Sequence, residues 1–303
     1  MLTVLRTILR ILLGLFFITT AVLKLMSLDS FEIYIYSFGL FGFNACAIVA
    51  RLVIAAEMLI GIFLIAKILY KPTWWLAMLM LAGFTLFLVY VAIFRNDTNC
   101  HCMGDILEIN PVMSIVKNVV TMLLMLLVRK EDDYRFKGKV AVGVLAVLAS
   151  VVVPFVLFPT DAAYNLFLKQ DNAVNEKDFD LLMQDSTIQS LHLDEGHYVF
   201  GVISAECKYC KLSARKIDAI VTNNQLDTNK VLFLIWGSDS AVRAFREETQ
   251  ATRFRYVPIG PLQAIRLVDG QFPTYIFVQD GKPADAVDIR GLGDEKIRDF
   301  LTK

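Results

Sequence analysis

Two closely spaced cysteine pairs are the residues of this 303-residue chain that point most directly to chemistry: Cys100 with Cys102, and Cys207 with Cys210. Thiols at such spacings either exchange electrons as dithiol and disulfide or bind a soft metal ion. A disulfide within Cys-x-Cys closes a small strained ring, and strained disulfides are easily reduced, which suits a transfer site. In Cys-x-x-Cys, the helix N-terminus stabilises the first cysteine as a thiolate, and the second lies one turn later. We therefore expect Cys207 to be the nucleophile and Cys210 to resolve the mixed disulfide.

A metal site is the alternative interpretation of the first pair. Cys46, Cys100, His101 and Cys102 carry the soft ligands that Cu(I) or Zn prefers, so the rival function is copper or other metal handling in a membrane. Half a zinc site also has the form Cys-x-x-Cys, but the chain has no second motif of that kind. Because each thiol pair offers the other a redox partner, we favour electron transfer at both and expect no bound metal.

The first pair lies in an apolar half of the chain that is rich in candidate membrane spans. A helix needs about 20 apolar residues to cross a bilayer, and five segments meet that length or nearly so. They are residues 4–26, 46–67, 74–94, 111–129 and 139–159. We thus expect four membrane helices and a fifth span that tethers a soluble domain.

The positive charges of the connectors predict the orientation of these spans. Lys and Arg gather before the first span, at Lys67 and Lys71 after the second, and between Arg129 and Lys139 before the fifth. Since positive residues favour the cytoplasmic side, we expect a cytoplasmic N-terminus and a periplasmic C-terminal domain in a bacterial inner membrane. All five cysteines then lie on the outer side, and no thiol pair faces inward.

Four charged residues inside the spans are candidates for function. Intramembrane charges are costly and usually pair or face the bundle interior. Glu57 and Arg10 could meet as a buried ion pair that fixes helix register, or Glu57 could serve a proton or substrate. Arg51 and Lys117 lie in the outer halves of their spans, where they could favour thiolates, bind a quinone carbonyl, or extend to the interface.

After Pro159 the composition becomes that of a soluble α/β domain. His197–Ser204 and Val231–Trp236 are apolar, β-branched runs that predict buried strands, with a helix from the second cysteine pair to about Val221 between them. Further expected elements are a hairpin of Phe179–Met183 and Thr187–Leu191, a helix over Ala241–Gln250 capped by Ser238, strands at Ile265–Val268 and Thr274–Gln279, and a helix at Glu295–Leu301. Strand, Cys-x-x-Cys, helix, strand, helix, hairpin, helix is the order of a thioredoxin-like fold.

Two family resemblances follow from these residues. Arg10–Phe17, Glu57 and the Cys-x-Cys before the fourth span, with Gly104 after it, make residues 4–130 similar to the DoxX superfamily and to its MauE-like branch. This implies membrane redox chemistry linked to quinones and to the maturation of disulfide-containing outer proteins. The Cys-x-x-Cys with Phe272-Pro273-Thr274 makes residues 178–303 resemble membrane-tethered, TlpA-like thioredoxin domains. That resemblance implies that Pro273 is cis and abuts the active cysteines.

Composition limits the classes of function. The chain is 56% hydrophobic, and its 30 basic and 30 acidic residues balance, which excludes a single soluble globule and argues against nucleic acid as a partner. We expect a DoxX/MauE-like bundle at 1–130, a basic loop and fifth span at 131–160, and a thioredoxin-like domain at 161–303. Together they predict a membrane thiol–disulfide oxidoreductase whose partners are periplasmic client thiol proteins, the lipid bilayer and a quinone.

Overall fold

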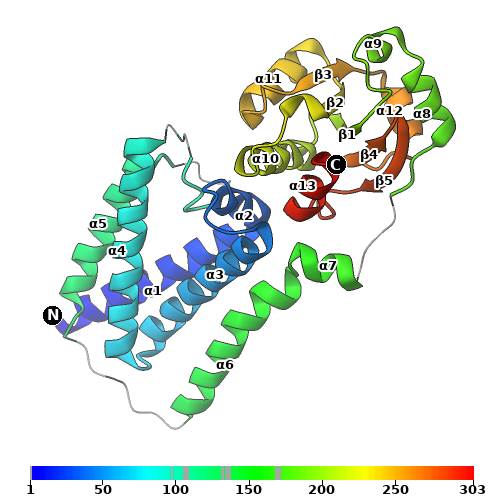
Figure 1. The fold of residues 1–303 in the computed structure, drawn as a ribbon. Coiled ribbons are helices and arrows are strands. Elements are labelled where there is room, and N and C mark those ends of the chain that lie inside the picture. The colour runs from blue at the N-terminus through cyan, green and yellow to red at the C-terminus, as the bar shows by residue number, and fades with distance from the viewer. Residues whose placement is uncertain are drawn as a thin grey trace. The chain divides into compact units, whose positions relative to one another are not determined.

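The computed structural model describes residues 2–95, 97, 99–104, 109–130, 133, 138–167 and 172–303. The chain divides into two compact units. The membrane unit consists of Met1–Ile35 and Ala45–Thr160, and the α/β unit of Tyr36–Asn44 and Asp161–Lys303. The predicted class, a helical membrane bundle followed by an α/β domain, is confirmed (Figure 1).

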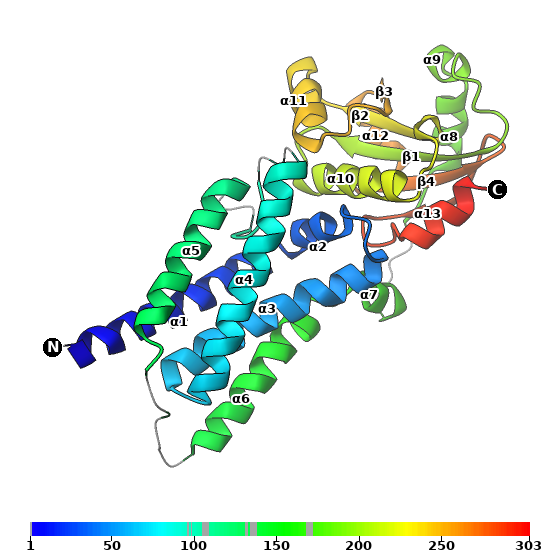
Figure 2. The ribbon, with the colours of Figure 1, turned by 60° about the vertical axis from the view of Figure 1, so that its left-hand side comes forward.

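Helices of uniformly apolar sequence build the membrane unit. They are α1 (Leu2–Met26), α2 (Leu28–Tyr36), α3 (Phe43–Ala66), α4 (Tyr70–Phe94), α5 (Pro111–Leu127) and α6 (Lys139–Val152), which a π-helical turn, η1 (Val153–Leu157), continues. Among the described residues, four segments are long and apolar enough to cross a membrane, namely those of α1, α3, α4 and α6 with η1. The remaining predicted span, 111–129, is α5, a helix of 17 residues, about 26 Å long. It lies beside α4 in both views (Figures 1 and 2).

Close approach of α1 and α3 explains two residues of the sequence motif in α1. A Cβ atom at Gly14 would lie 2.8 Å from the carbonyl oxygen of Gly61, and one at Gly61 would lie 2.7 Å from that of Gly14. Small residues at both positions therefore let the two backbones meet. Arg10, one turn earlier, donates to the carbonyl oxygens of Leu64 and Ile65 at the C-terminal end of α3. The predicted meeting of Arg10 with Glu57 is wrong, because the guanidinium caps a helix end instead.

A five-stranded sheet forms the centre of the α/β unit. The strands are β1 (His197–Ser204), β2 (Val231–Trp236), β3 (Arg255–Pro258), β4 (Thr274–Gln279) and β5 (Lys282–Val287), in the order β3-β2-β1-β4-β5. β2 runs parallel to both β1 and β3, whereas β4 is antiparallel to β1 and β5. The bounds of β1 and β2 agree with the prediction, because strands buried on both faces are continuous apolar runs.

Helices cover both faces of this sheet. The helical elements of the α/β unit are α7 (Asp161–Phe167), α8 (Glu176–Met183), α9 (Ser186–Gln189), α10 (Lys208–Asn223), a 3-10 turn η2 (Thr228–Lys230), α11 (Asp239–Thr249), α12 (Pro261–Leu267) and α13 (Asp294–Leu301). Phe200 and Val202 of β1 pack in one core with residues of α8 and α12. On the opposite face Tyr275 donates to Ser213 of α10 over 2.8 Å, and Figures 1 and 2 show α10 and α13 together there. Successive strand residues thus serve the two faces alternately.

Two predictions for this unit are wrong, and two of its strands were missed. The hairpin predicted at 179–191 is the helix pair α8 and α9, because Asn175 and Asp185 cap the two N-termini and Phe179 and Leu182 face the core at helical spacing. The strand predicted at 265–268 belongs mostly to α12, which starts at Pro261. The edge strand β3 and the strand β5 were not predicted.

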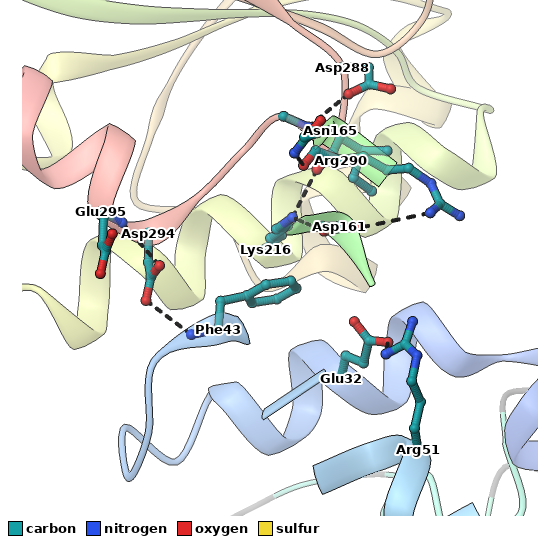
Figure 3. A network of polar contacts seen from close by, with 12 residues as sticks. Glu32, Phe43, Arg51, Asp161, Asn165, Lys216, Asp288, Arg290, Asp294 and Glu295 are labelled. Carbon is teal, nitrogen blue, oxygen red and sulfur yellow. Dashed lines mark hydrogen bonds and ion pairs between the residues drawn. The ribbon is translucent and has the colours of Figure 1, made fainter. Parts of the chain in front are cut away.

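A buried lysine ties the N-terminal segment Tyr36–Asn44 to the rest of the α/β unit. Lys216 of α10 is 1% exposed and donates to Asp161 (2.8 Å) and to the carbonyl oxygen of Ile289 (2.9 Å). Its ammonium lies 4.1 Å from the ring centroid of Phe43, and the backbone of Phe43 donates to Asp294 over 3.0 Å (Figure 3). Residues far apart in sequence therefore complete one unit.

Candidate functional site: two thiol pairs

The first candidate site lies where β1 leads into α10. Cys207 is the N-cap of α10, and its sulfur accepts the backbone N–H of Cys210 over 3.3 Å. Cys210 is fully buried, and its sulfur accepts the N–H of Ser204 over 3.4 Å. The thiol of Cys210 and the amides at the helix start stabilise the Cys207 thiolate and lower the pKa of Cys207 to about 6. The same interaction, with burial, raises the pKa of Cys210 far above its ordinary value. The geometry thus separates an accessible thiolate from a buried thiol.

Pro273 lies at the same end of the sheet as this pair. The Phe272–Pro273 peptide bond is cis, as the sequence predicted. Thr274, the next residue, is the partner of Val202 in the antiparallel ladder of β4 and β1. The proline therefore precedes β4 at the end of β1 that continues toward Cys207.

Trp236 is a residue at this site that the sequence reasoning passed over. It pairs with Ser204 at the end of the parallel ladder, and its carbonyl oxygen accepts the N–H of Ala205 over 3.0 Å. Its ring lies 6.3 Å from that of Phe272, and its indole N–H is buried without a partner among the described residues. The sequence signal that could have placed Trp236 at this site was its position as the last residue of the predicted strand Val231–Trp236.

The second candidate site is the connector between α4 and α5. Cys100 is 1% exposed, and its sulfur lies 3.0 Å from the hydroxyl oxygen of Ser114 and 3.4 Å from the backbone nitrogen of Cys102. The Cys102 thiol, the Ser114 hydroxyl and the Lys117 charge lower the pKa of Cys100 to about 6, against the effect of burial. The pKa of Cys102 is raised by its hydrogen bond to Cys100 and by burial. Both cysteines are free thiols, so the arrangement again joins a thiolate to a protonated partner.

Gly104 fixes this connector on α1. Its φ is +70°, a conformation that favours glycine. A Cβ atom there would lie 2.5 Å from the carbonyl oxygen of Leu23 and even closer to the hydroxyl of Ser27. The Cys-x-Cys loop therefore rests directly on the turn of α1 that contains Lys24.

The intramembrane charges pair differently from the prediction. Glu57 accepts from Lys24, and Arg51 donates to Glu32 and, over 2.9 Å, to the carbonyl oxygen of Phe158. The positive charge of Lys117 interacts with both thiols. Of the two cations predicted in the outer halves of their spans, Arg51 and Lys117, the structure therefore brings Lys117 to the Cys-x-Cys site. The predicted partners of these charges did not include Lys24, which lies near the end of the first predicted span, or Glu32, which lies between the first two predicted spans.

The residues of the alternative metal site do not converge. Among the residues that the structure describes, no three His, Cys, Asp or Glu side chains lie close enough to hold a metal ion. Cys46 is buried in α3, and the ring of His101 lies 4.9 Å from that of Tyr34. Cys46, Cys100, His101 and Cys102 therefore form no metal centre in this structure.

The fold and the two sites define a multi-pass membrane protein with an α/β unit that carries a second thiol pair. Residues 2–129 match the family model described as "Methylamine utilisation protein MauE". The predicted resemblance to MauE is confirmed for this region. The matched region includes the Cys-x-Cys loop and the Arg10–Phe17 motif of α1.

A second comparison covers part of the chain. Protein TlpB of Flavobacterium psychrophilum is 28% identical over 171 residues, which are 52% of this chain and 46% of that protein. The chain thus spans about half the length of this curated relative. No solved structure matches the chain.

Proposed function

We propose that the chain is a membrane-bound thiol–disulfide oxidoreductase in which Cys100–Cys102 and Cys207–Cys210 exchange electrons. The observation that carries this proposal is the same asymmetry at both pairs: a thiol whose pKa is lowered to about 6 is hydrogen-bonded to one whose pKa is raised. At neutral pH such a pair supplies an attacking thiolate and keeps a second thiol in reserve.

The α/β unit performs the exchange with client proteins in two steps. The Cys207 thiolate attacks one sulfur of a client disulfide, and the client's other sulfur leaves as a thiolate that takes up a proton. Cys210 then loses its proton and attacks the Cys207 sulfur, which releases the reduced client and leaves a Cys207–Cys210 disulfide. The reverse sequence oxidises a client, so the geometry serves both directions.

The two pairs meet most simply on one side of the membrane. The charge pattern of the connectors supports a periplasmic α/β unit in a bacterial inner membrane, although Arg135 and Lys137 of the basic connector lie outside the described residues. Linkage in one chain raises the effective concentration of one pair at the other. The clients are then periplasmic thiol proteins, and no feature favours nucleic acid.

A membrane quinone is the electron partner that we propose for Cys100–Cys102. A bound quinone would accept or supply two electrons as quinone and quinol. Lys117 fits this role, since its ammonium has no hydrogen bond or ion pair among the described residues and lies 5.9 Å from the ring centroid of Phe16. Arg51 fits less well, because Glu32 and backbone carbonyls occupy its donors.

Trapping of clients tests the exchange at the α/β unit. Cys210→Ala keeps the attacking thiolate but removes the resolving thiol, so mixed disulfides with clients should accumulate and disappear on reduction. Cys207→Ala is the matched control and should trap none. Equal trapping by the two variants would contradict the assignment of the nucleophile.

The exchange between the pairs is tested by Cys102→Ser in membranes with and without quinone. The Cys207–Cys210 pair should then settle at a different ratio of dithiol to disulfide. A shift toward dithiol means that the membrane pair normally oxidises the α/β unit, and a shift toward disulfide means that it reduces it. An unchanged ratio at normal abundance of the variant would refute the relay.

A further inference from the structure

The ion pair between Lys24 of α1 and Glu57 of α3 is buried and incompletely satisfied. Both residues are 4% exposed. Lys24 donates to Oε1 of Glu57, whereas Oε2 is buried without a partner among the described residues. The rings of Phe31 and Phe84 lie 6.0 and 5.5 Å from the ammonium. An ionised carboxylate with an unsatisfied oxygen in such surroundings is costly.

This pair lies next to the Cys-x-Cys loop. The loop rests on α1 on either side of Lys24, since Gly104 contacts Leu23 and Ser27. The charge of Lys24 acts on Cys102. Cys102 therefore shares the charge of Lys24 with Glu57.

One further cation belongs to the same site. The charge of Lys117 of α5 interacts with Glu57, with Lys24 and with both thiols. The titratable groups that face Glu57 thus come from α1, α5 and the connector, while α2 and α4 contribute the rings of Phe31 and Phe84. The Cys100 thiolate and the Glu57 carboxylate therefore compete for the charge of Lys117.

We propose that Glu57 stores a proton for the Cys100–Cys102 pair: it is protonated while the pair carries a thiolate and ionised once the pair is a disulfide. This inference rests on the thiol exchange proposed above. Its physical basis is constant charge, because a carboxylate replaces the thiolate near Lys117 when the thiolate is consumed. A site of low dielectric strongly favours such compensation.

The exchange with an incoming disulfide then balances without any other reactant. The Cys100 thiolate attacks one sulfur, the incoming S–S bond breaks, and the first leaving thiolate takes the proton of Glu57. The Cys102 thiol attacks Cys100, the Cys100–Cys102 bond forms, and the second leaving thiolate takes the Cys102 proton. Two electrons and two protons pass to the incoming disulfide, and one negative charge moves from Cys100 to Glu57.

The proton count of the Cys100–Cys102 couple tests this proposal. The midpoint potential is measured against pH in full-length protein with Cys207 and Cys210 replaced by Ser. The range is about pH 7 to 8, above the pKa of about 6 of Cys100, and thiolate absorbance confirms that the reduced pair is ionised. Wild-type Glu57 should give two protons for two electrons, although a thiolate is present. Glu57→Gln should give one, which halves the slope of potential against pH.

Two variants separate this effect from a general disturbance of the bundle. Glu32→Gln breaks the other buried ion pair, that with Arg51, and should keep the full slope. The double variant Lys24→Met with Glu57→Gln removes both charges of the pair, so that Lys24 is not left without its partner, and it should also show the halved slope. This variant keeps the test decisive where Glu57→Gln alone fails to fold.

Different outcomes separate this proposal from the proposed function. A single proton for two electrons with Glu57 present, or an unchanged slope in Glu57→Gln with the thiolate still visible, would overturn the inference alone. Failure of Cys100 and Cys102 to form a reversible disulfide would refute the proposed function, and this inference with it. Infrared difference spectra give an independent readout: a protonated carboxyl band should vanish on oxidation and be missing in Glu57→Gln.

Discussion

Replacement of Gly104 by alanine should release the Cys-x-Cys loop from α1. The added Cβ would lie 2.5 Å from the carbonyl oxygen of Leu23, which is backbone and cannot swing aside, and would collide with the hydroxyl of Ser27. The φ of +70° adds backbone strain for any residue with a Cβ. The closed loop is therefore destabilised from two sources.

The size of the effect follows from these two sources. A left-handed conformation costs a non-glycine residue about 1–2 kcal/mol, and forced overpacking costs about 1–3 kcal/mol. Their sum of about 2–5 kcal/mol raises the population of open loops by roughly 30-fold or more, at about 1.4 kcal/mol for each factor of ten. Since Cys100 is 1% exposed when the loop is closed, its reaction with an alkylating reagent requires opening.

The assay compares alkylation rates of Cys100 in membranes. Gly104→Ala should accelerate the reaction about 30-fold or more, until the intrinsic rate of the thiolate limits it. Gly83→Ala is the matched control, because no atom lies within 4 Å of the Cβ it would add in α4, and its rate should equal that of the wild type. A Gly104→Ala protein whose Cys100 reacts as slowly as before would refute the reasoning.

The remaining predictions concern reactivity and stability. Alkylation of Cys207 should rise with pH through a midpoint of about 6, the value to which its pKa is lowered, since the thiolate is the reactive form; a midpoint above 8 would contradict this. Ser114→Ala removes a hydrogen-bond donor from the Cys100 sulfur and should move the midpoint of that thiol upward by about one to two pH units, as read from its alkylation profile. Lys216→Met should lower the unfolding free energy of the α/β unit by about 2–4 kcal/mol, measured by pulse proteolysis. Lys211→Met, which breaks an exposed pair, should cost less than about 1 kcal/mol.

The elements predicted correctly from the sequence are those that appear in it as a continuous run of apolar residues or as a motif. The parallel strands β1 and β2 are apolar along their full length, and the membrane helices are apolar all round. The helix after Cys207 begins where the motif required. Composition along a short stretch was sufficient for the strands, because both of their faces are buried, and for the membrane helices, because their apolar runs are about as long as a bilayer is thick.

The wrong predictions concern segments whose structure or partners depend on tertiary contacts. The α8 segment has a helical face only because Phe179 and Leu182 meet the sheet, and its short length makes its period ambiguous. The partner of Glu57 depends on the rotation of α1 and α3 about their axes. Apolar helices do not encode that rotation in their sequence, so the prediction named Arg10 as the partner, whereas the structure pairs Glu57 with Lys24 and places Arg10 at the end of α3.

The inclusion of Tyr36–Asn44 in the α/β unit has a consequence for biosynthesis. Tyr36 accepts a hydrogen bond from Asn223, 187 residues later in the chain, and Phe43 donates to Asp294, 251 residues later. At about 5–20 residues per second, the ribosome needs roughly 10–50 s to make these partners. The segment is therefore made early and has to wait for its partners while the later membrane helices are synthesised. A fragment that begins at Asp161 would lack this segment and leave the aromatic contact of Lys216 unmade, so expression of the α/β unit alone calls for joining residues 36–44 to it.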